Sequence, residues 1–596
     1  MRNTQLRGAQ YLYHSILILF GFLTFGMSRA QNSSTLEKVA VYPSLIIYNG
    51  KIASMDSKMT FYQAMAVRDD RIWKMGTNAD IKPLAGPPTE MVDVKGHTVV
   101  PGLIDAHTHP HLWALPHLGG KYDPQLAPVY VEGKDMQEVK SRLREALQNR
   151  IRQAGTDKWI IASIPWQLAY QLSTKDGISR ADLDAIAPNT PVFMASGYFS
   201  GVSNSKAVDI MDKKLGKEMV GLRAWYMVPY DIILPDKLNT IADMLVEEMK
   251  ENVTYGITTF ATHIEPISVY RALNMLHLQG KMPARWAWVH RTGFTLAKDP
   301  VEFYRLLGDF TGQGDNWLWN FGVGQESWGG SCTAAIPKTD EVRRRLQGCT
   351  YTIGNVGYEA HKAAVESGLR LAIVHAINDG ELDGAIRLAD QVIKEGSLTL
   401  DQVRNPGWSF DHGHLVRPDQ IPLAARYGFW MSFQATQAVS SIETVPQDFG
   451  DQYISWITPI NSWIKAGARF ILSSDSHIGK LDPEADKMID QSLIRGWPYH
   501  DSIWPWVGWW VTREYQGKVW SPDERIDRIT ALRGWTIYAA EDLLRGKELG
   551  SLEPGKLADF AVIDKDYFTI PDKDLVTINN LMTGLNGKVV YKSPNF

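Results

Sequence analysis

Short apolar runs alternate with stretches of helical spacing through the middle of the chain. The helical stretches, such as 239–256 and 358–368, repeat apolar residues every three or four positions. Regular alternation of strand and helix implies a parallel sheet, and this many units predicts an α/β fold with a (β/α)8 TIM-like barrel. The β-like runs occupy 158–166, 190–197, 256–263, 285–291, 369–376, 407–414, 429–435 and 468–477.

The two ends of the chain have a different pattern. Between 44 and 102, short apolar runs are separated by Asn-Gly, Asp-Asp and Lys-Gly turns, and the segments 550–566 and 584–592 have the same character. This is the pattern of β-hairpins. We therefore expect one small β-sandwich domain built from both chain termini, which divides the chain into 31–100 (β domain), 101–545 (barrel) and 546–596 (β domain).

The first thirty residues have the pattern of a secretory signal peptide. Arg2 and Arg7 precede an apolar core at 15–27, and Ser-Arg-Ala ending at Ala30 fits a small-x-small cleavage site. The core is short for a membrane span. We expect residues 1–30 to be removed and the enzyme to be periplasmic or secreted, without stable membrane insertion; an uncleaved anchor is the alternative.

Composition narrows the functional classes. Of the 596 residues, 44% are hydrophobic and 21% charged, and the formal net charge is −4 without a long basic block. This is typical of a soluble globular protein and argues against nucleic acid as the main partner. The two cysteines, Cys332 and Cys349, are too few for a zinc finger, but an oxidising compartment would allow a disulfide. The tryptophan-rich stretch 497–510 indicates either packing or an aromatic cleft or patch.

The segment 99–111, VVPGLIDAHTHPH, carries the first chemical signal. Its apolar stretch predicts a strand that delivers His107 and His109, two residues apart and therefore on one face. Both imidazoles can then reach one metal ion, and neutral histidine suits zinc and similar divalent ions.

Three later strand ends carry further ligand types. His375 ends one apolar run, His412 and His414 follow another, and Asp475 follows a third. Strand ends of a (β/α)8 barrel meet at one mouth, where active sites lie. The sequence therefore predicts a shared divalent-metal site, with zinc as the expected metal and one or two ions.

The chain resembles the amidohydrolase superfamily of metal hydrolases. The resemblance rests on DAHTHP at 105–110, the C-terminal block 550–564 and the order His-x-His, His, His, Asp. The segments 180–194, 375–380 and 535–560 make it similar, more narrowly, to the YtcJ-like branch, amidohydrolase family 3.

The resemblance implies a role for each matching residue. His107 and His109 would bind a first metal, and His375 and His412 would bind the same ion or a second one. Asp475 would bind metal and act as the general base, taking a proton from the activated water.

Two segments depart from the family pattern. Many members carry a bridging lysine, but 320–336 contains none, so Glu326 is either a substitute metal ligand or an ordinary loop residue. The segment that begins GYF is aromatic where the family has histidine. The candidate substrate-binding residues are Tyr198, His263, Trp328, Asp379 and His477.

The function that follows is hydrolysis of a C–N, amide-type bond in a small organic molecule. A carbamate, ester or lactone hydrolase with the same site is the alternative within enzymes. A catalytically inactive secreted binding protein is the alternative of another class, motivated by the missing lysine. A membrane-anchored interaction protein is a third reading, and a homo-oligomer is compatible with the sequence.

Overall fold

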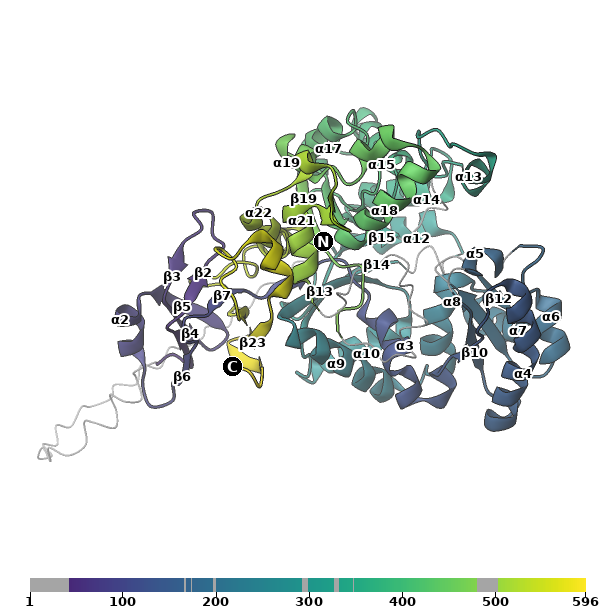
Figure 1. The fold of residues 1–596 in the computed structure, drawn as a ribbon, viewed down its shortest axis with the longest axis horizontal. Coiled ribbons are helices and arrows are strands. Elements are labelled where there is room, and N and C mark those ends of the chain that lie inside the picture. The colour runs from purple at the N-terminus through teal and green to yellow at the C-terminus, as the bar shows by residue number, and fades with distance from the viewer. Residues whose placement is uncertain are drawn as a thin grey trace, which may run out of the picture. The chain divides into compact units, whose positions relative to one another are not determined.

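Eight parallel strands form the largest sheet of the molecule, in the order β19-β18-β17-β16-β15-β14-β13-β8. The edge strands meet through Asp105, whose carboxylate accepts hydrogen bonds from the N–H and hydroxyl of Ser474. The predicted barrel is confirmed (Figure 1). Its strands are β8 (Leu103–Asp105), β13 (Ile257–Ile264), β14 (Arg285–His290), β15 (Leu318–Gln325), β16 (Leu371–Ala376), β17 (Ser409–His412), β18 (Trp430–Gln434) and β19 (Arg469–Ser473).

The computed structural model describes most of the chain. The described residues are 42–165, 168–172, 174–196, 200–291, 298–325, 332–346, 348–479 and 502–596.

Alternation along the strands divides the core into two layers. Ala287 and Val289 of β14 belong to an apolar cluster with Trp319 and Phe321 of β15, whereas Trp286 packs in the larger cluster that includes the helices. This is the period of two expected of strands that are buried on both faces. Helices alternate with the barrel strands along the chain. They include α9 (Leu238–Thr254), α10 (Ile267–Leu278), α12 (Pro300–Leu307), α14 (Val356–Glu366), α15 (Asp379–Lys394), α17 (Ile421–Tyr427) and, after β19, α22 (Arg528–Gly534).

Two of the predicted runs lie outside the barrel. The runs 158–166 and 190–197 form β10 (Ile160–Ser163) and β11 (Val192–Ser196). These strands belong to a separate four-stranded sheet, together with β9 (Val129–Tyr130) and β12 (Ser200–Ser203). Along the chain, α4 (Met136–Ala154) lies between β9 and β10, α6 (Arg180–Ile186) lies between β10 and β11, and α7 (Ser205–Leu215) follows β12. Assigning both runs to the barrel was wrong, because local apolar patterning does not specify which sheet a strand joins.

Strand β15 takes a place in the barrel that the pattern did not predict. Its glycines weaken the strand signal. A Cβ added at Gly324 would lie 2.0 Å from the carbonyl oxygen of Ala372, on the neighbouring strand β16. The glycine therefore permits a close approach of two backbones.

A β-sandwich is built from both ends of the chain, as predicted. Strand β22 (Phe560–Ile563) pairs antiparallel with β7 (Thr98–Pro101) in a six-stranded sheet of order β24-β23-β22-β7-β2-β3. A four-stranded sheet, β5-β4-β1-β6, shares an apolar core with it. Figure 1 shows these N-terminal strands together, with the C-terminal strand β23 near β7. The remaining strands are β1 (Leu45–Tyr48), β2 (Lys51–Ala53), β3 (Phe61–Tyr62), β4 (Ala64–Arg68), β5 (Arg71–Gly76), β6 (Glu90–Asp93), β23 (Asn580–Leu585) and β24 (Lys588–Lys592).

The described part of the tryptophan-rich stretch serves packing. Helix α21 (Trp504–Thr512) buries Trp504, Trp506, Trp509 and Trp510 almost completely. In the residues that the structure describes, we find no helix with the length and apolar character needed to cross a membrane.

Candidate metal centre

His107 and His109 lie just beyond a barrel strand rather than within it. Strand β8 ends at Asp105, and His109 is the residue that precedes helix α3 (Pro110–Tyr122). The apolar run before them is two strands, because β7 belongs to the sandwich and β8 to the barrel. Gly102 separates them, and a Cβ there would lie 2.3 Å from the hydroxyl oxygen of Thr258.

The carboxylate of Asp475 is the point at which the histidines meet. Its Oδ1 lies 3.3 Å from Nε2 of His107 and 3.3 Å from Nε2 of His109. Its Oδ2 lies 3.8 Å from Nδ1 of His412 and accepts a hydrogen bond of 3.0 Å from the amide of Gln437, on α18 (Ala435–Asp448). The side chain of Asp475 is 10% exposed, so the carboxylate is largely shielded from water.

His375 and His412 come from neighbouring strands, β16 and β17. Their ring centroids are 4.2 Å apart, and the ring of His412 lies 5.2 Å from that of His107. His412 has φ of 81° and Asp475 has φ of 46°. Non-glycine residues adopt this left-handed conformation rarely, and such strain concentrates at functional sites. The structure therefore places His107, His109, His375, His412 and Asp475 together at one end of the barrel strands.

Outer contacts orient the histidines. Nδ1 of His107 lies 3.1 Å from Oδ2 of Asp411, and Nδ1 of His109 lies 3.0 Å from the hydroxyl of Thr262. Sequence reasoning missed Asp411 and Thr262. Asp411 lies directly before His412, but it reads as one more residue of a buried strand.

The third histidine is oriented in the same way. Nδ1 of His412 lies 3.1 Å from Oε1 of Gln434, and its Nε2 is buried without a hydrogen-bond partner in the described part of the chain. Partners of this kind fix the tautomer and ring orientation of metal-binding histidines. Gln434 was also missed by the sequence, because a glutamine that ends a strand has no distinct pattern.

The electrostatics favour an ionised Asp475. Burial raises the pKa of this carboxyl, but His107, His109 and His412 outweigh burial and hold the pKa well below its usual range. Burial lowers the pKa of His107, whereas Asp411 and Asp475 raise it well above the usual value. The pKa of His412 falls well below its usual value through burial and the neighbouring His375.

The donor set fits a divalent transition metal. Buried imidazoles and one carboxylate converge, and the ligand atoms of His107, His412 and Asp475 all lie within 4.8 Å of one another. Nitrogen and carboxylate donors in this combination are typical of zinc sites. Nε2 of His412, which has no hydrogen-bond partner among the described residues, is available to bind a metal.

The other candidate residues have mixed positions. The ring of His263, on β13, lies 4.7 Å from that of His109, so His263 borders the centre. His477 pairs instead with Glu248, its Nδ1 lying 3.1 Å from Oε1. A substrate role for His263 and His477 stays a prediction. Glu326, Trp328 and Tyr198 lie outside the described residues.

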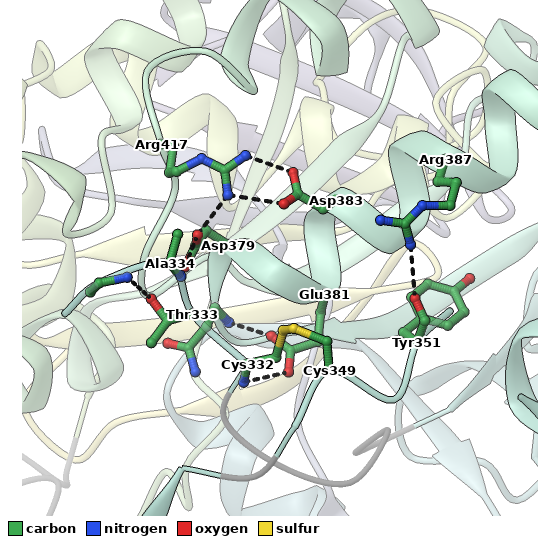
Figure 2. The surroundings of a disulfide bond; sticks show 12 residues. Cys332, Thr333, Ala334, Cys349, Tyr351, Asp379, Glu381, Asp383, Arg387 and Arg417 are labelled. Carbon is green, nitrogen blue, oxygen red and sulfur yellow. Dashed lines mark hydrogen bonds and ion pairs between the residues drawn. A yellow bond between two sulfur atoms is a disulfide. The ribbon is translucent and has the colours of Figure 1, made fainter. Parts of the chain in front are cut away.

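Asp379 belongs to a network beside a disulfide (Figure 2). The bond joins Cys332 and Cys349, whose Cα atoms are 4.8 Å apart. Asp379 accepts hydrogen bonds from the N–H of Ala334, at 3.1 Å, and from the guanidinium of Arg417, at 2.7 Å. Its carboxylate therefore anchors the segment after the disulfide to α15, and a substrate role for Asp379 stays a prediction.

Comparison with known proteins identifies the family. A model described as "Amidohydrolase family" matches residues 90–485 and 500–591. The chain belongs to the amidohydrolase family. This membership supports a hydrolase rather than the catalytically inactive binding protein considered from the sequence.

Individual relatives are distant but similar along nearly their whole length. The chain is 24% identical to an N-substituted formamide deformylase of Arthrobacter pascens, covering 92% of this chain and 98% of the relative. It is 22% identical to YtcJ of Bacillus subtilis, covering 92% and 99%. An uncharacterised metal-dependent hydrolase of Pyrococcus horikoshii has the same fold, with a TM-score of 0.57 at 20% identity over 89% of this chain and 99% of that one.

Proposed function

We propose that the enzyme hydrolyses a C–N bond of the amide type in a small organic molecule, using a bound divalent ion, with zinc as the metal. The observation that carries the proposal is the meeting of His107, His109 and His412 at the carboxylate of Asp475. The formamide deformylase among the relatives supports an amide, and N-substituted formamides are the first substrates to test.

His107, His109, His375 and His412 would hold the metal together with Asp475. When bound, such an ion acidifies a water molecule and polarises the scissile carbonyl. Asp475 would act as the general base, because the surrounding histidines hold the pKa of its carboxyl well below the usual range and its Oδ1 faces His107 and His109. It takes a proton from the attacking water and returns it to the nitrogen that leaves.

The neighbouring residues keep Asp475 ready for this task. The amide of Gln437 donates to Oδ2 and leaves Oδ1 directed at His107 and His109. The backbone N–H of Asp475 donates to the carbonyl of His107 at 2.9 Å, which ties the base to the first histidine loop. Positioning a general base is worth about 10²–10⁴-fold in rate.

A substrate panel tests the reaction class. Zinc-loaded enzyme is assayed with an N-substituted formamide, an N-acetyl amide, a carbamate, an ester and a lactone, with Asp475→Asn as the matched inactive control. We expect the highest kcat/KM on the amides. Turnover confined to the carbamate, the ester or the lactone would replace the amide assignment while leaving the centre in place. Equal turnover by the control would reject the role of Asp475.

We also propose export of the enzyme, with cleavage after Ala30. The disulfide between Cys332 and Cys349 supports an oxidising compartment, since such bonds are rare in reducing ones. N-terminal sequencing of the protein purified from its host should begin at Gln31. Recovery of the Met1 terminus from membranes would indicate the uncleaved anchor instead.

A further inference from the structure

A second set of histidines and a carboxylate lies beside the centre just described. His117 comes from α3, Glu248 from α9 and His477 from the segment after β19. Oε2 of Glu248 lies 2.9 Å from Nδ1 of His117, and Oε1 lies 3.1 Å from Nδ1 of His477. Glu248 is fully buried, and the side chains of His477 and His117 are 1% and 11% exposed.

One of the two contacts does not have the geometry of a hydrogen bond. Nδ1 of His477 and Oε1 of Glu248 lie 3.1 Å apart, at ion-pair distance, but the contact does not meet hydrogen-bond angles and neither atom has another hydrogen-bond partner in the part of the chain that the structure describes. Buried polar atoms are normally satisfied, so this pair requires an explanation. Nδ1 of His107 and Oδ2 of Asp411, at the catalytic centre, are in the same situation.

The distances suit coordination of one ion by these side chains. Nitrogen and oxygen ligands about 2.0–2.1 Å from a tetrahedral zinc lie about 3.3 Å from each other. The 3.1 Å gap between Glu248 and His477 is near this value, and the three ligand atoms lie within 4.8 Å of one another. The 2.9 Å contact between Glu248 and His117 is a hydrogen bond, which a bound ion would replace. Glu251, one turn beyond Glu248 on α9, has its Oε2 3.5 Å from Nε2 of His117, the ring nitrogen on the other side, and would orient that ring as an outer partner.

We propose that His117, Glu248 and His477 form a second binding site for a divalent transition ion of the zinc type, separate from the catalytic centre. The ion would tie α3, which follows His109, and the segment that carries Asp475 to the same residue of α9. Its role is to hold the two halves of the catalytic centre in register. Each oxygen of the buried Glu248 faces an imidazole, a position that suits a ligand rather than a base that takes protons from a substrate.

Counting zinc in a variant that lacks the catalytic ligands tests this site. The full chain with His107→Ala and His412→Ala is stripped with a chelator, reloaded with Zn²⁺, desalted and measured by plasma mass spectrometry. We expect about one zinc per chain to remain, as a closed three- or four-ligand site retains its ion. Adding His117→Ala or Glu248→Gln should remove it. Because the catalytic ligands are absent, the result does not depend on the proposed reaction.

Glu247→Gln is the matched control. Glu247 joins the same two helices through Lys121, with Nζ–Oε1 of 2.6 Å, and among the described residues it forms no hydrogen bond or ion pair with His117, Glu248 or His477. It should leave the zinc count unchanged. His117 lies at the edge of the cluster, so its alanine variant is informative even if Glu248→Gln does not fold. Absence of zinc from the double variant, or a count unchanged by His117→Ala, would overturn the site and leave a buried ion pair.

Discussion

The two histidine–carboxylate clusters differ in what surrounds their donors. At the proposed catalytic centre, Nδ1 of His107, His109 and His412 each lies 3.0–3.1 Å from the side-chain oxygen of a residue outside the donor set. In the second cluster the carboxylate of Glu248 itself lies between two imidazoles, so each of its oxygens faces a ring nitrogen. The first arrangement directs donors toward a shared space, as catalysis requires, whereas the second is closed and suits a structural role.

Replacing Asp475, the proposed base, should have the largest effect on turnover and should distinguish the two clusters most clearly. Asp475→Asn keeps the shape and one coordinating oxygen but abolishes the carboxylate that takes the proton, so kcat should fall by about 10²–10⁴-fold. Metal content should stay close to that of the wild type. His117→Ala should lower turnover by less than Asp475→Asn, because it removes the ion that holds the centre in register but leaves the base in place. Steady-state kinetics on a verified substrate, with metal analysis of the same samples, checks both variants. Undiminished turnover of Asp475→Asn would contradict the mechanism.

The outer partner of His107 should give the next largest effect. Asp411→Asn removes a buried negative charge 3.1 Å from Nδ1 of His107. Loss of such a partner typically weakens metal binding by about 10–100-fold. Competition with a fluorescent chelator measures the affinity. We expect Asp411→Asn to bind zinc more weakly at the catalytic centre. When Asp411→Asn is added to the chain with His107→Ala and His412→Ala, the zinc that remains at the second site should be unaffected. Wild-type affinity would show that Asp411 does not orient the ring.

The sequence predicted the inner part of this centre better than its surroundings. The five ligand candidates could be found because each follows an apolar run, and barrel topology brings strand ends together. Asp411 and Gln434 could not, since each lies at a buried strand position with no distinct pattern. The cluster of His117, Glu248 and His477 joins residues from distant parts of the chain, which no local motif connects.

The fold shows the same division between local and long-range information. Helices at 239–256 and 358–368 were recognised from their apolar spacing, and α9 and α14 confirm them. Strands β10 and β11 have the apolar character of barrel strands but pair in another sheet. Strand pairing depends on which segments the chain brings together, and that is a property of the whole fold rather than of the segment.

The hydroxyl beside His109 should have a smaller effect than Asp411. Thr262→Val keeps the size of the side chain but removes the hydroxyl 3.0 Å from Nδ1 of His109. A neutral hydrogen bond contributes about 0.5–1.5 kcal/mol, so metal affinity should fall by about two- to tenfold. Thr262→Ser, which keeps the hydroxyl, is the control for lost packing. The assignment fails if Thr262→Ser weakens metal binding as much as Thr262→Val.

The smallest effect is expected where the two helices meet at the surface. Glu247→Gln breaks the ion pair with Lys121. The side chain of Glu247 is 39% exposed and that of Lys121 is 61% exposed. Water screens such a pair, so the free energy of unfolding should change by at most about 1 kcal/mol. Glu248, its neighbour on α9, is fully buried between two imidazoles, and breaking a buried pair typically costs about 3–5 kcal/mol. Denaturant unfolding of Glu247→Gln and Glu248→Gln, both in the presence of a chelator so that no zinc is bound, measures the difference. Equal destabilisation by the two variants would mean that the buried contacts of Glu248 do not hold α3 and α9 together more strongly than the exposed pair does.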